Sequence, residues 1–222
     1  MNIFDIIGPI MVGPSSSHTA GAVKIGLMVS ALLGSRPESV EISLHGSFAE
    51  TGKGHGTDVA LVAGLLGMEP DDMRIPHSLF IADEYDMKVT IGNVELPDAH
   101  PNTALVRVCD KEGDLLEVQA CSLGGGRIQI NRIDGLSVNC SGEMPTLIIR
   151  NTDMPGMVAE VTAVLARHHI NIAGMHLYRN AKGQDAVMVV ETDQLVPEEE
   201  INALHDQEGI LKVTYIEQGA EA

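Results

Sequence analysis

The sequence has 222 residues, of which 44% are hydrophobic and 20% are charged, enough for one large domain or two small ones. Its 14 Lys and Arg residues and 31 Asp and Glu residues give a formal net charge of −17 at pH 7. Because a phosphate backbone or an anionic membrane surface is bound through a basic face, this charge argues against nucleic-acid and membrane partners. The sequence contains no apolar run of the length that spans a bilayer.

The cysteines are few, and their number is odd. Cys109, Cys121 and Cys140 show no C-x-x-C spacing, which suits a reducing cytoplasm and argues against a disulfide framework. Three thiols also fall short of the four thiolates that hold an iron–sulfur cluster. The first 13 residues contain Asp5 and no basic segment, so we expect no signal peptide and a cytoplasmic location.

The N-terminal part is predicted to mix helices and strands. Apolar periodicity predicts helices at 17–33 and 58–66, each followed by a glycine, with a strand at 40–45 between them. Gly, Asn and Asp turns separate four further expected strands, at about 87–91, 103–109, 115–121 and 127–133. Together these elements predict an α+β domain with an antiparallel sheet.

A polar stretch at 137–146 containing Gly and Pro is typical of a link between domains, so we expect domains at 1–140 and 146–222. The second domain is predicted to run strand, helix, strand, strand, helix, strand. Its strands are expected at 146–150, 170–179, 186–191 and 210–216, with helices from the Pro155–Gly156 turn to about His168 and from Pro197 onward. This βαββαβ order is that of the ferredoxin-like fold.

The first candidate functional segment is the polar run Ser15, Ser16, Ser17, His18 and Thr19, at the start of the first predicted helix. Free N–H groups and the partial positive charge of a helix N-terminus favour a carboxylate or phosphate, and the hydroxyls add donors. The same dipole disfavours imidazolium, so His18 is expected to be neutral and able to act as a base. Ordinary N-capping by a serine is the alternative, although a cap does not require five polar side chains.

The second candidate is the glycine-rich segment that precedes the helix at 58–66. Its glycine spacing does not fit a Walker phosphate loop. We expect a loop whose backbone approaches a ligand closely and whose last residue, Thr57 or Asp58, caps the next helix; a tight connection that needs positive φ is the alternative. The side chains that this loop would bring to a ligand are His45, Ser47 and His55.

Two further polar segments, His100–Asn102 and Ser122–Gly126, are interpreted as turns. The His, Asp and Glu residues show no spacing typical of a metal motif, so no metal site is expected on this chain.

Four segments together resemble the beta chain of the bacterial iron–sulfur-dependent L-serine dehydratases. They are Gly13-Pro-Ser-Ser-Ser-His-Thr19, His45-Gly-Ser47, Thr51-Gly-Lys-Gly-His-Gly-Thr-Asp58 and His100-Pro-Asn102. The resemblance extends over nearly all of residues 1–140, and its specific part is the first segment.

Residues 146–222 resemble an ACT domain, an amino-acid-sensing module. Asn151-Thr-Asp153-Met-Pro-Gly156 is similar to the usual turn after the first strand, and Asn171 to the entry of the second strand. The resemblance implies self-association through this domain, with a ligand or an interface near Asn151, Asp153, Gly156 and Asn171.

The resemblance implies the beta subunit of a two-chain L-serine ammonia-lyase, which converts L-serine to pyruvate and ammonia in amino-acid metabolism and gluconeogenesis. A separate alpha chain would hold the [4Fe–4S] cluster. On this chain, His18 would be the general base. The substrate-binding side chains would be Ser15, Ser16, Ser17, Thr19, His45, Ser47 and His55.

The N-terminal domain is also similar to the allosteric substrate-binding domain of some phosphoglycerate dehydrogenases. A purely regulatory, amino-acid-sensing or dimerisation subunit without catalytic residues therefore stays open as the alternative function.

Overall fold

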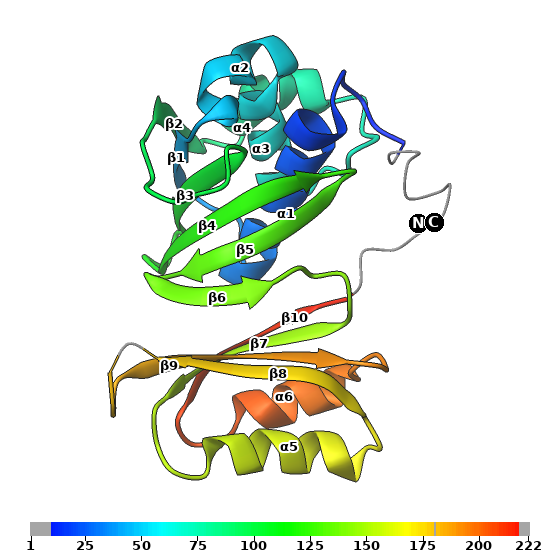
Figure 1. Cartoon of the computed structure of the whole chain (residues 1–222), viewed down its shortest axis with the longest axis vertical. Coiled ribbons are helices and arrows are strands. Elements are labelled where there is room, and N and C mark those ends of the chain that lie inside the picture. The colour runs from blue at the N-terminus through cyan, green and yellow to red at the C-terminus, as the bar shows by residue number, and fades with distance from the viewer. Residues whose placement is uncertain (1–9, 180, 218–222) are drawn as a thin grey trace. The chain divides into compact units, whose positions relative to one another are not determined.

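A computed structural model describes residues 10–179 and 181–217 (Figure 1). The chain divides into two compact units, Met1–Gly135 and Leu136–Ala222. The domain limits expected from the sequence, 1–140 and 146–222, stay a prediction. Most of the segment expected not to be a signal peptide lies outside the described residues. Within the described ranges, no helix combines the length and the apolar character needed to cross a membrane.

The first unit contains helices and a mixed sheet (Figure 1). Its helical segments are a π-helical turn Ser16–Ala20, α1 Gly21–Leu33, α2 Ser47–His55, α3 Thr57–Leu65, a 3₁₀ turn Ile75–His77 and α4 Ser78–Glu84. Its strands are β1 Ser39–Leu44, β2 Lys88–Asn93, β3 Thr103–Cys109, β4 Leu115–Gly124 and β5 Arg127–Ile133. The strands are ordered β2-β1-β3-β4-β5.

The strands predicted in this unit are confirmed, but the expected antiparallel sheet is wrong at one edge. β1 pairs with β2 in parallel and with β3 antiparallel. The helices α2 to α4 lie between β1 and β2 in the chain. They carry the chain back along the sheet, as a parallel connection requires.

The predicted glycine-rich loop is wrong as well, because Ser47–His55 forms helix α2. Neither Thr57 nor Asp58 is the helix cap: Gly56, at φ +68°, is the N-cap of α3, and no side-chain hydrogen bond caps this helix. Gly56 therefore serves as the junction between two consecutive helices, where a left-handed backbone reverses the chain direction.

Helices α1 and α3 pack backbone to backbone through two glycines. A Cβ atom at Gly26 would clash with the Leu61 carbonyl oxygen, and one at Gly64 would clash with the Val23 carbonyl oxygen. Gly at both positions lets the helices approach more closely than any side chain would allow. α1 in turn packs against β4 and β5.

The second unit has the predicted βαββαβ order, preceded by one extra strand. Its elements are β6 Leu136–Cys140, β7 Thr146–Thr152, α5 Met157–Arg167, β8 Ile172–Arg179, β9 Asp185–Thr192, α6 Glu198–His205 and β10 Ile210–Ile216. The four-stranded sheet has the order β10-β7-β9-β8, and α5 and α6 cover one face (Figure 1). Of the stretch 137–146, expected to be a linker, residues 137–140 belong to β6 and Thr146 begins β7, so only 141–145 connect two strands.

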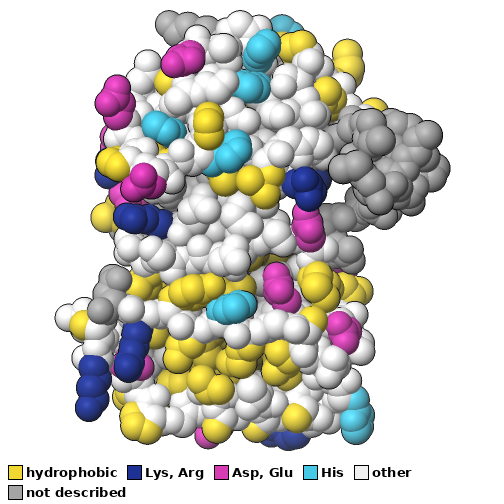
Figure 2. Space-filling model, in the orientation of Figure 1, with side chains coloured by type: hydrophobic (Ala, Val, Ile, Leu, Met, Phe, Trp, Pro, Cys, Tyr) yellow, Lys and Arg dark blue, Asp and Glu magenta, His cyan; other side chains and the backbone are white. Residues whose placement is uncertain are grey.

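The core of the second unit follows from two periodicities. Leu147 and Ile149 on β7 alternate toward one face of the sheet, as do Met188 and Val190 on β9. Residues recurring at helical spacing on α5, among them Val161 and Leu165, fill the opposite side of the same core. Hydrophobic side chains also lie at the surface of this unit (Figure 2), Leu177 of the edge strand β8 among them.

A methyl group at either contact glycine must push α1 and α3 apart. We expect Gly26→Ala and Gly64→Ala each to lower the free energy of unfolding by about 1–3 kcal/mol, the usual cost of overpacking. Urea denaturation followed by circular dichroism measures this loss. Gly54→Ala is the matched control, because Gly54 is also helical and a Cβ there meets no atom within 4 Å. Equal stabilities of the Gly26→Ala and Gly54→Ala variants would contradict the contact.

Candidate functional site

The polar run before α1 forms a π-helical turn, Ser16–Ala20. Ser15 is its N-cap, because the Ser15 Oγ accepts a hydrogen bond from the His18 backbone N–H at 3.1 Å. Capping therefore accounts for Ser15. It does not account for Ser16 or Ser17, whose hydroxyls form no hydrogen bond with any described residue. π-helical turns are rare and often occur at functional sites.

His18 lies at the centre of a small cluster built from the π-helical turn and α2. A hydrogen bond of 3.0 Å joins His18 Nε2 to the Oγ of Ser47, the first residue of α2. The imidazole also meets the rings of Phe48 and His55 edge to face, with centroids 5.3 and 5.0 Å away. The structure thus brings together His18, Ser47 and His55, three of the side chains predicted to line the site.

The surroundings of His18 favour its neutral form. Burial lowers the pKa of His18 below its ordinary value of 6.5, and the neighbouring His55 lowers it further, while a hydrogen bond at Ser47 acts in the opposite direction. His18 is therefore neutral at pH 7, which is the protonation state of a general base.

Three buried polar atoms around this turn have no hydrogen-bond partner among the described residues. They are His55 Nδ1, Thr57 Oγ1 and Ser122 Oγ. The His55 carbonyl accepts a hydrogen bond from Thr19 Oγ1 at 3.2 Å, and a Cβ on Gly21 would clash with Ser122 Oγ. Buried polar groups without partners are uncommon and are expected where a ligand or a catalytic step uses them.

His45 has a different environment from the other predicted site residues. Its Nδ1 accepts a hydrogen bond from the Leu96 backbone N–H at 3.2 Å and lies 3.3 Å from the Val94 carbonyl oxygen. These contacts tie the end of β1 to the segment after β2. No described contact joins His45 to His18, so its local role is to hold this connection together.

Two residues near the π-helical turn, Phe48 and Ser122, were not predicted as site residues. Phe48 is fully buried and packs its ring against His18, but a lone aromatic residue in a glycine-rich segment gives no functional signal. Ser122 lies at the end of β4, just before three glycines at φ +91°, +62° and +75°. A Cβ on the first of them, Gly124, would lie 3.4 Å from Ser17 Oγ. The glycine triplet was the available signal.

The thiols of this chain do not fit an iron–sulfur cluster. Burial raises the pKa of Cys121, and it raises the pKa of Cys140 to about 11, whereas metal ligation requires the thiolate. Among the described residues, the potential metal ligands that lie within reach of one another include no cysteine.

In the second unit, three of the four predicted ligand or interface residues share one turn. Asn151 is buried, and its Oδ1 has no partner among the described residues. The Asp153 carboxylate accepts hydrogen bonds from Gly183 N–H at 2.9 Å and from Arg179 at 2.6 Å. These bonds lower the pKa of Asp153. Gly156, at φ +103°, is the N-cap of α5.

Asn171 lies at the other end of this sheet. Asn151 is opposite Ala186 on β9, whereas Ile172, the neighbour of Asn171, is opposite Thr192. Six residues of strand separate the two levels, about 20 Å. Asn171 Nδ2 instead donates a hydrogen bond to Asp193 at 2.6 Å. One copy of the unit therefore does not bring all four residues to a single ligand.

Comparison with known proteins gives consistent matches over both units. Residues 2–93 match the Serine dehydratase beta chain family, and residues 145–209 match the ACT domain family. The probable L-serine dehydratase, beta chain, of Bacillus subtilis (strain 168) is 41% identical over 215 residues, 97% of each chain. The L-serine dehydratase, beta chain, of Peptoniphilus asaccharolyticus is 36% identical over 215 residues, which are 96% of this chain and 97% of that protein.

Two further matches are partial. L-serine dehydratase TdcG of Escherichia coli (strain K12) is 32% identical over 169 residues, which are 65% of this chain and 37% of that protein. A solved ACT domain, from the GTP pyrophosphokinase of Chlorobium tepidum, covers 32% of this chain and 94% of its own with 20% identity and a TM-score of 0.27.

The lowered pKa of His18 can be measured on this chain without any partner. In an NMR titration we expect His18 to titrate below pH 6.5, and His55→Gln to move that titration to higher pH because a neighbouring positive charge is removed. His77→Gln, at an exposed histidine of the same unit, is the control and should leave it unchanged. A His18 pKa at or above 6.5 would contradict the effects of burial and of His55 described above.

The same shift predicts how stability depends on pH. Because folding lowers the pKa of His18, the unfolded chain binds more protons than the folded chain as the pH falls below 6.5. The contribution of His18 to stability is therefore complete above pH 6.5 and is lost as the pH falls through the folded pKa. Urea denaturation at pH 7.5 and at pH 5.5 measures this effect. Between the two pH values, the free energy of unfolding should fall less in His18→Asn than in the unaltered chain.

Proposed function

This chain belongs to the L-serine dehydratase beta-chain family and carries an ACT domain, and we propose that its π-helical turn forms one side of the active site. The enzyme is an L-serine dehydratase, of which this chain is a subunit. The first unit would bind L-serine and remove its α-proton. The observation that carries this proposal is the contact of His18 with His55 among buried polar groups that lack partners.

In the proposed reaction, neutral His18 takes the proton from the α-carbon of L-serine. The electrons of the broken C–H bond form the Cα–Cβ double bond as the β-hydroxyl leaves, and the proton that His18 has taken joins the hydroxyl to give water. The resulting aminoacrylate tautomerises to an imine, which water hydrolyses to pyruvate and ammonia. Ser47 holds the His18 ring through its hydrogen bond to Nε2 and so orients the base.

The substrate carboxylate would bind at the N-terminal end of α1. Ser16 and Ser17 hydroxyls are not used in any described hydrogen bond, so they are available as donors. The helix N-terminus adds a partial positive charge. With its carboxylate bound there, an amino acid would have its α-carbon beside the imidazole of His18.

His55 is the second candidate for the base. Its Nδ1 is buried without a partner, whereas both nitrogens of His18 lie near serine hydroxyls. If His55 removes the proton, His18 positions its ring through their edge-to-face contact. Separate variants of the two histidines distinguish these roles.

The site is proposed to be completed by a separate alpha chain that holds the iron–sulfur cluster. Cys121 and Cys140 of this chain are buried, and burial raises the pKa of both thiols, so they do not fit the cluster. The chain also matches only 37% of the length of the E. coli dehydratase TdcG. The rest of that protein is long enough to contain the function proposed here for the alpha chain. When bound, the cluster supplies a site that accepts the leaving hydroxyl.

The second unit is proposed to sense an amino acid and to associate with a second copy of itself. Buried Asn151 Oδ1, which lacks a partner, favours a ligand at the Asn151–Gly156 turn. Strand β8 lies at one edge of the four-stranded sheet, and its Leu177 is exposed. Both features favour association between copies. Asn171, at the far end of the sheet, could join this ligand site only from a partner copy.

The catalytic proposal is tested by measuring pyruvate formation from L-serine after anaerobic co-expression with an alpha chain. We expect His18→Asn to reduce turnover about 10²–10⁴-fold, as removal of a general base does, with an unchanged cluster spectrum. His77→Asn, at an exposed histidine, should keep full activity.

The same assay with His55→Asn assigns the base. Loss of turnover in His55→Asn with only a moderate loss in His18→Asn would transfer the role to His55. Near-normal turnover of both variants would overturn the proposal and leave this chain a regulatory or scaffolding subunit.

Sensing by the second unit is tested by the thermal unfolding of the full chain after exhaustive dialysis. Millimolar L-serine should raise the unfolding midpoint of the His18→Asn variant, and the additional change Asp153→Asn should reduce this rise because it loosens the turn. Glu198→Gln, at an exposed residue of α6, should not reduce it. No response to serine in His18→Asn would contradict an amino-acid site in this unit.

A further inference from the structure

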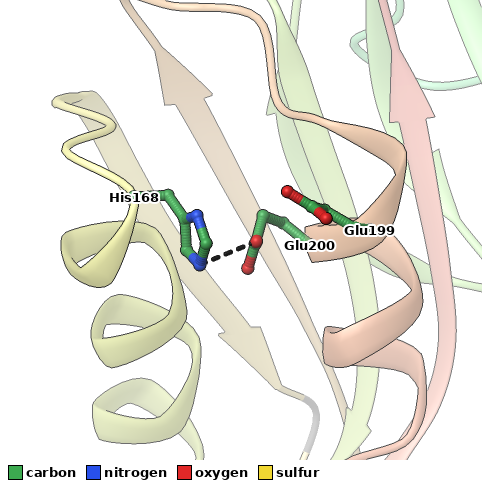
Figure 3. Close-up of side chains that lie close together, drawn as sticks. All are labelled: His168, Glu199 and Glu200. Atoms are coloured by element: carbon green, nitrogen blue, oxygen red, sulfur yellow. Dashed lines mark ion pairs between the residues drawn. The ribbon is translucent and has the colours of Figure 1, made fainter.

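A second group of functional side chains lies in the second unit, away from its Asn151–Gly156 turn. Figure 3 shows His168, at the C-terminal end of α5, facing Glu200 and Glu199 in the first turn of α6. His168 Nε2 and Glu200 Oε1 are 2.7 Å apart. One ligand atom from each of the three residues lies within 4.8 Å of the other two.

Glu200 is a buried carboxylate with few described partners. Its side chain is 6% exposed, and carboxylates at that depth are normally surrounded by donors. Asp110, the other buried carboxylate among the described residues, accepts hydrogen bonds from the Ser35 hydroxyl and from the backbone N–H groups of Glu112 and Asp114. By contrast, the described partner of Glu200 is a histidine alone, through Oε1.

The charges of this group are also unbalanced. No Lys or Arg among the described residues pairs with Glu199 or Glu200. Two carboxylates therefore share one site with no fixed cation among the described residues. A divalent cation would balance this charge.

We propose that His168, Glu199 and Glu200 bind a divalent cation of the zinc type that bridges the end of α5 and the start of α6. An imidazole nitrogen with two carboxylate oxygens suits Zn²⁺, whereas Mg²⁺ prefers oxygen ligands alone. Two ligands of a tetrahedral zinc ion lie about 3.3 Å apart, so the direct His168–Glu200 contact opens by about 0.6 Å to admit the ion. Water completes the coordination, since His168 and Glu199 are exposed.

The site does not depend on the proposed catalytic function, because it lies in the other unit and shares no residue with the π-helical turn. Its consequence is structural. The ion ties together the two helices that cover the sheet of the second unit, and so stabilises the fold around the Asn151–Gly156 turn without touching it.

Isothermal titration calorimetry of the full chain with Zn²⁺ tests the proposal by comparing two matched variants. Glu199→Gln removes a proposed ligand and leaves the His168–Glu200 pair intact. Glu198→Gln makes the same charge change at a neighbouring exposed residue of α6. We expect the unaltered chain and Glu198→Gln to bind one equivalent of Zn²⁺ that Glu199→Gln binds at least about tenfold more weakly, the lower limit for disturbing a metal site.

Two further measurements separate this site from background binding by the other histidines. Zn²⁺ should raise the thermal unfolding midpoint of the unaltered chain and of Glu198→Gln, but not that of Glu199→Gln or His168→Gln. An excess of Mg²⁺ should not displace the bound Zn²⁺. Equal stoichiometry and affinity in all variants, or displacement by Mg²⁺, would overturn the proposal.

Discussion

The backbone contact between α1 and α3 is the constraint on which the candidate active site depends. Gly26 and Gly64 meet with no side chain between them, which fixes the separation of the two helices. Gly26 lies eight residues after His18, and Gly64 lies nine residues after His55. His55 ends α2 and is joined to α3 by Gly56 alone, so the position of α3 against α1 also fixes the position of His55. The two imidazole rings meet 5.0 Å apart, and the helix contact holds the segments that carry them.

The electrostatics of the site are local. A net charge of −17 would favour a protonated imidazole if it acted at long range. Exposed charges are screened beyond about 8 Å in physiological salt, whereas burial and the neighbouring His55 act directly on His18 and lower its pKa. The neutral imidazole of His18 thus results from the π-helical turn and α2, and it does not require the rest of the chain to be less acidic.

Periodic segments were predictable from the sequence, and segments set by tertiary packing were not. Apolar periodicity identified α1, α3 and the whole βαββαβ order, because each buries one face. Helix α2 was predicted as a loop: its glycines suggest a turn, and burial of Phe48 overrides that local preference. Ser15 to Thr19 were found because they are consecutive. Ser122 was interpreted as part of a turn, although the glycine triplet after it marked the segment. The His168–Glu200 pair was missed, because the two residues are far apart in the sequence and no spacing pattern records such a contact.

The buried polar atoms without partners link the stability of the chain to binding at the site. Each such atom costs a folded protein about 1–3 kcal/mol, and His55 Nδ1, Thr57 Oγ1 and Ser122 Oγ occur around one turn. If a substrate or a facing chain supplies their hydrogen bonds, that cost is recovered on binding rather than on folding. The isolated chain would then be less stable than the assembled enzyme, and the groups that destabilise it would be those that recognise the substrate. Division of an active site between two chains favours this arrangement, because neither half is satisfied until both are present.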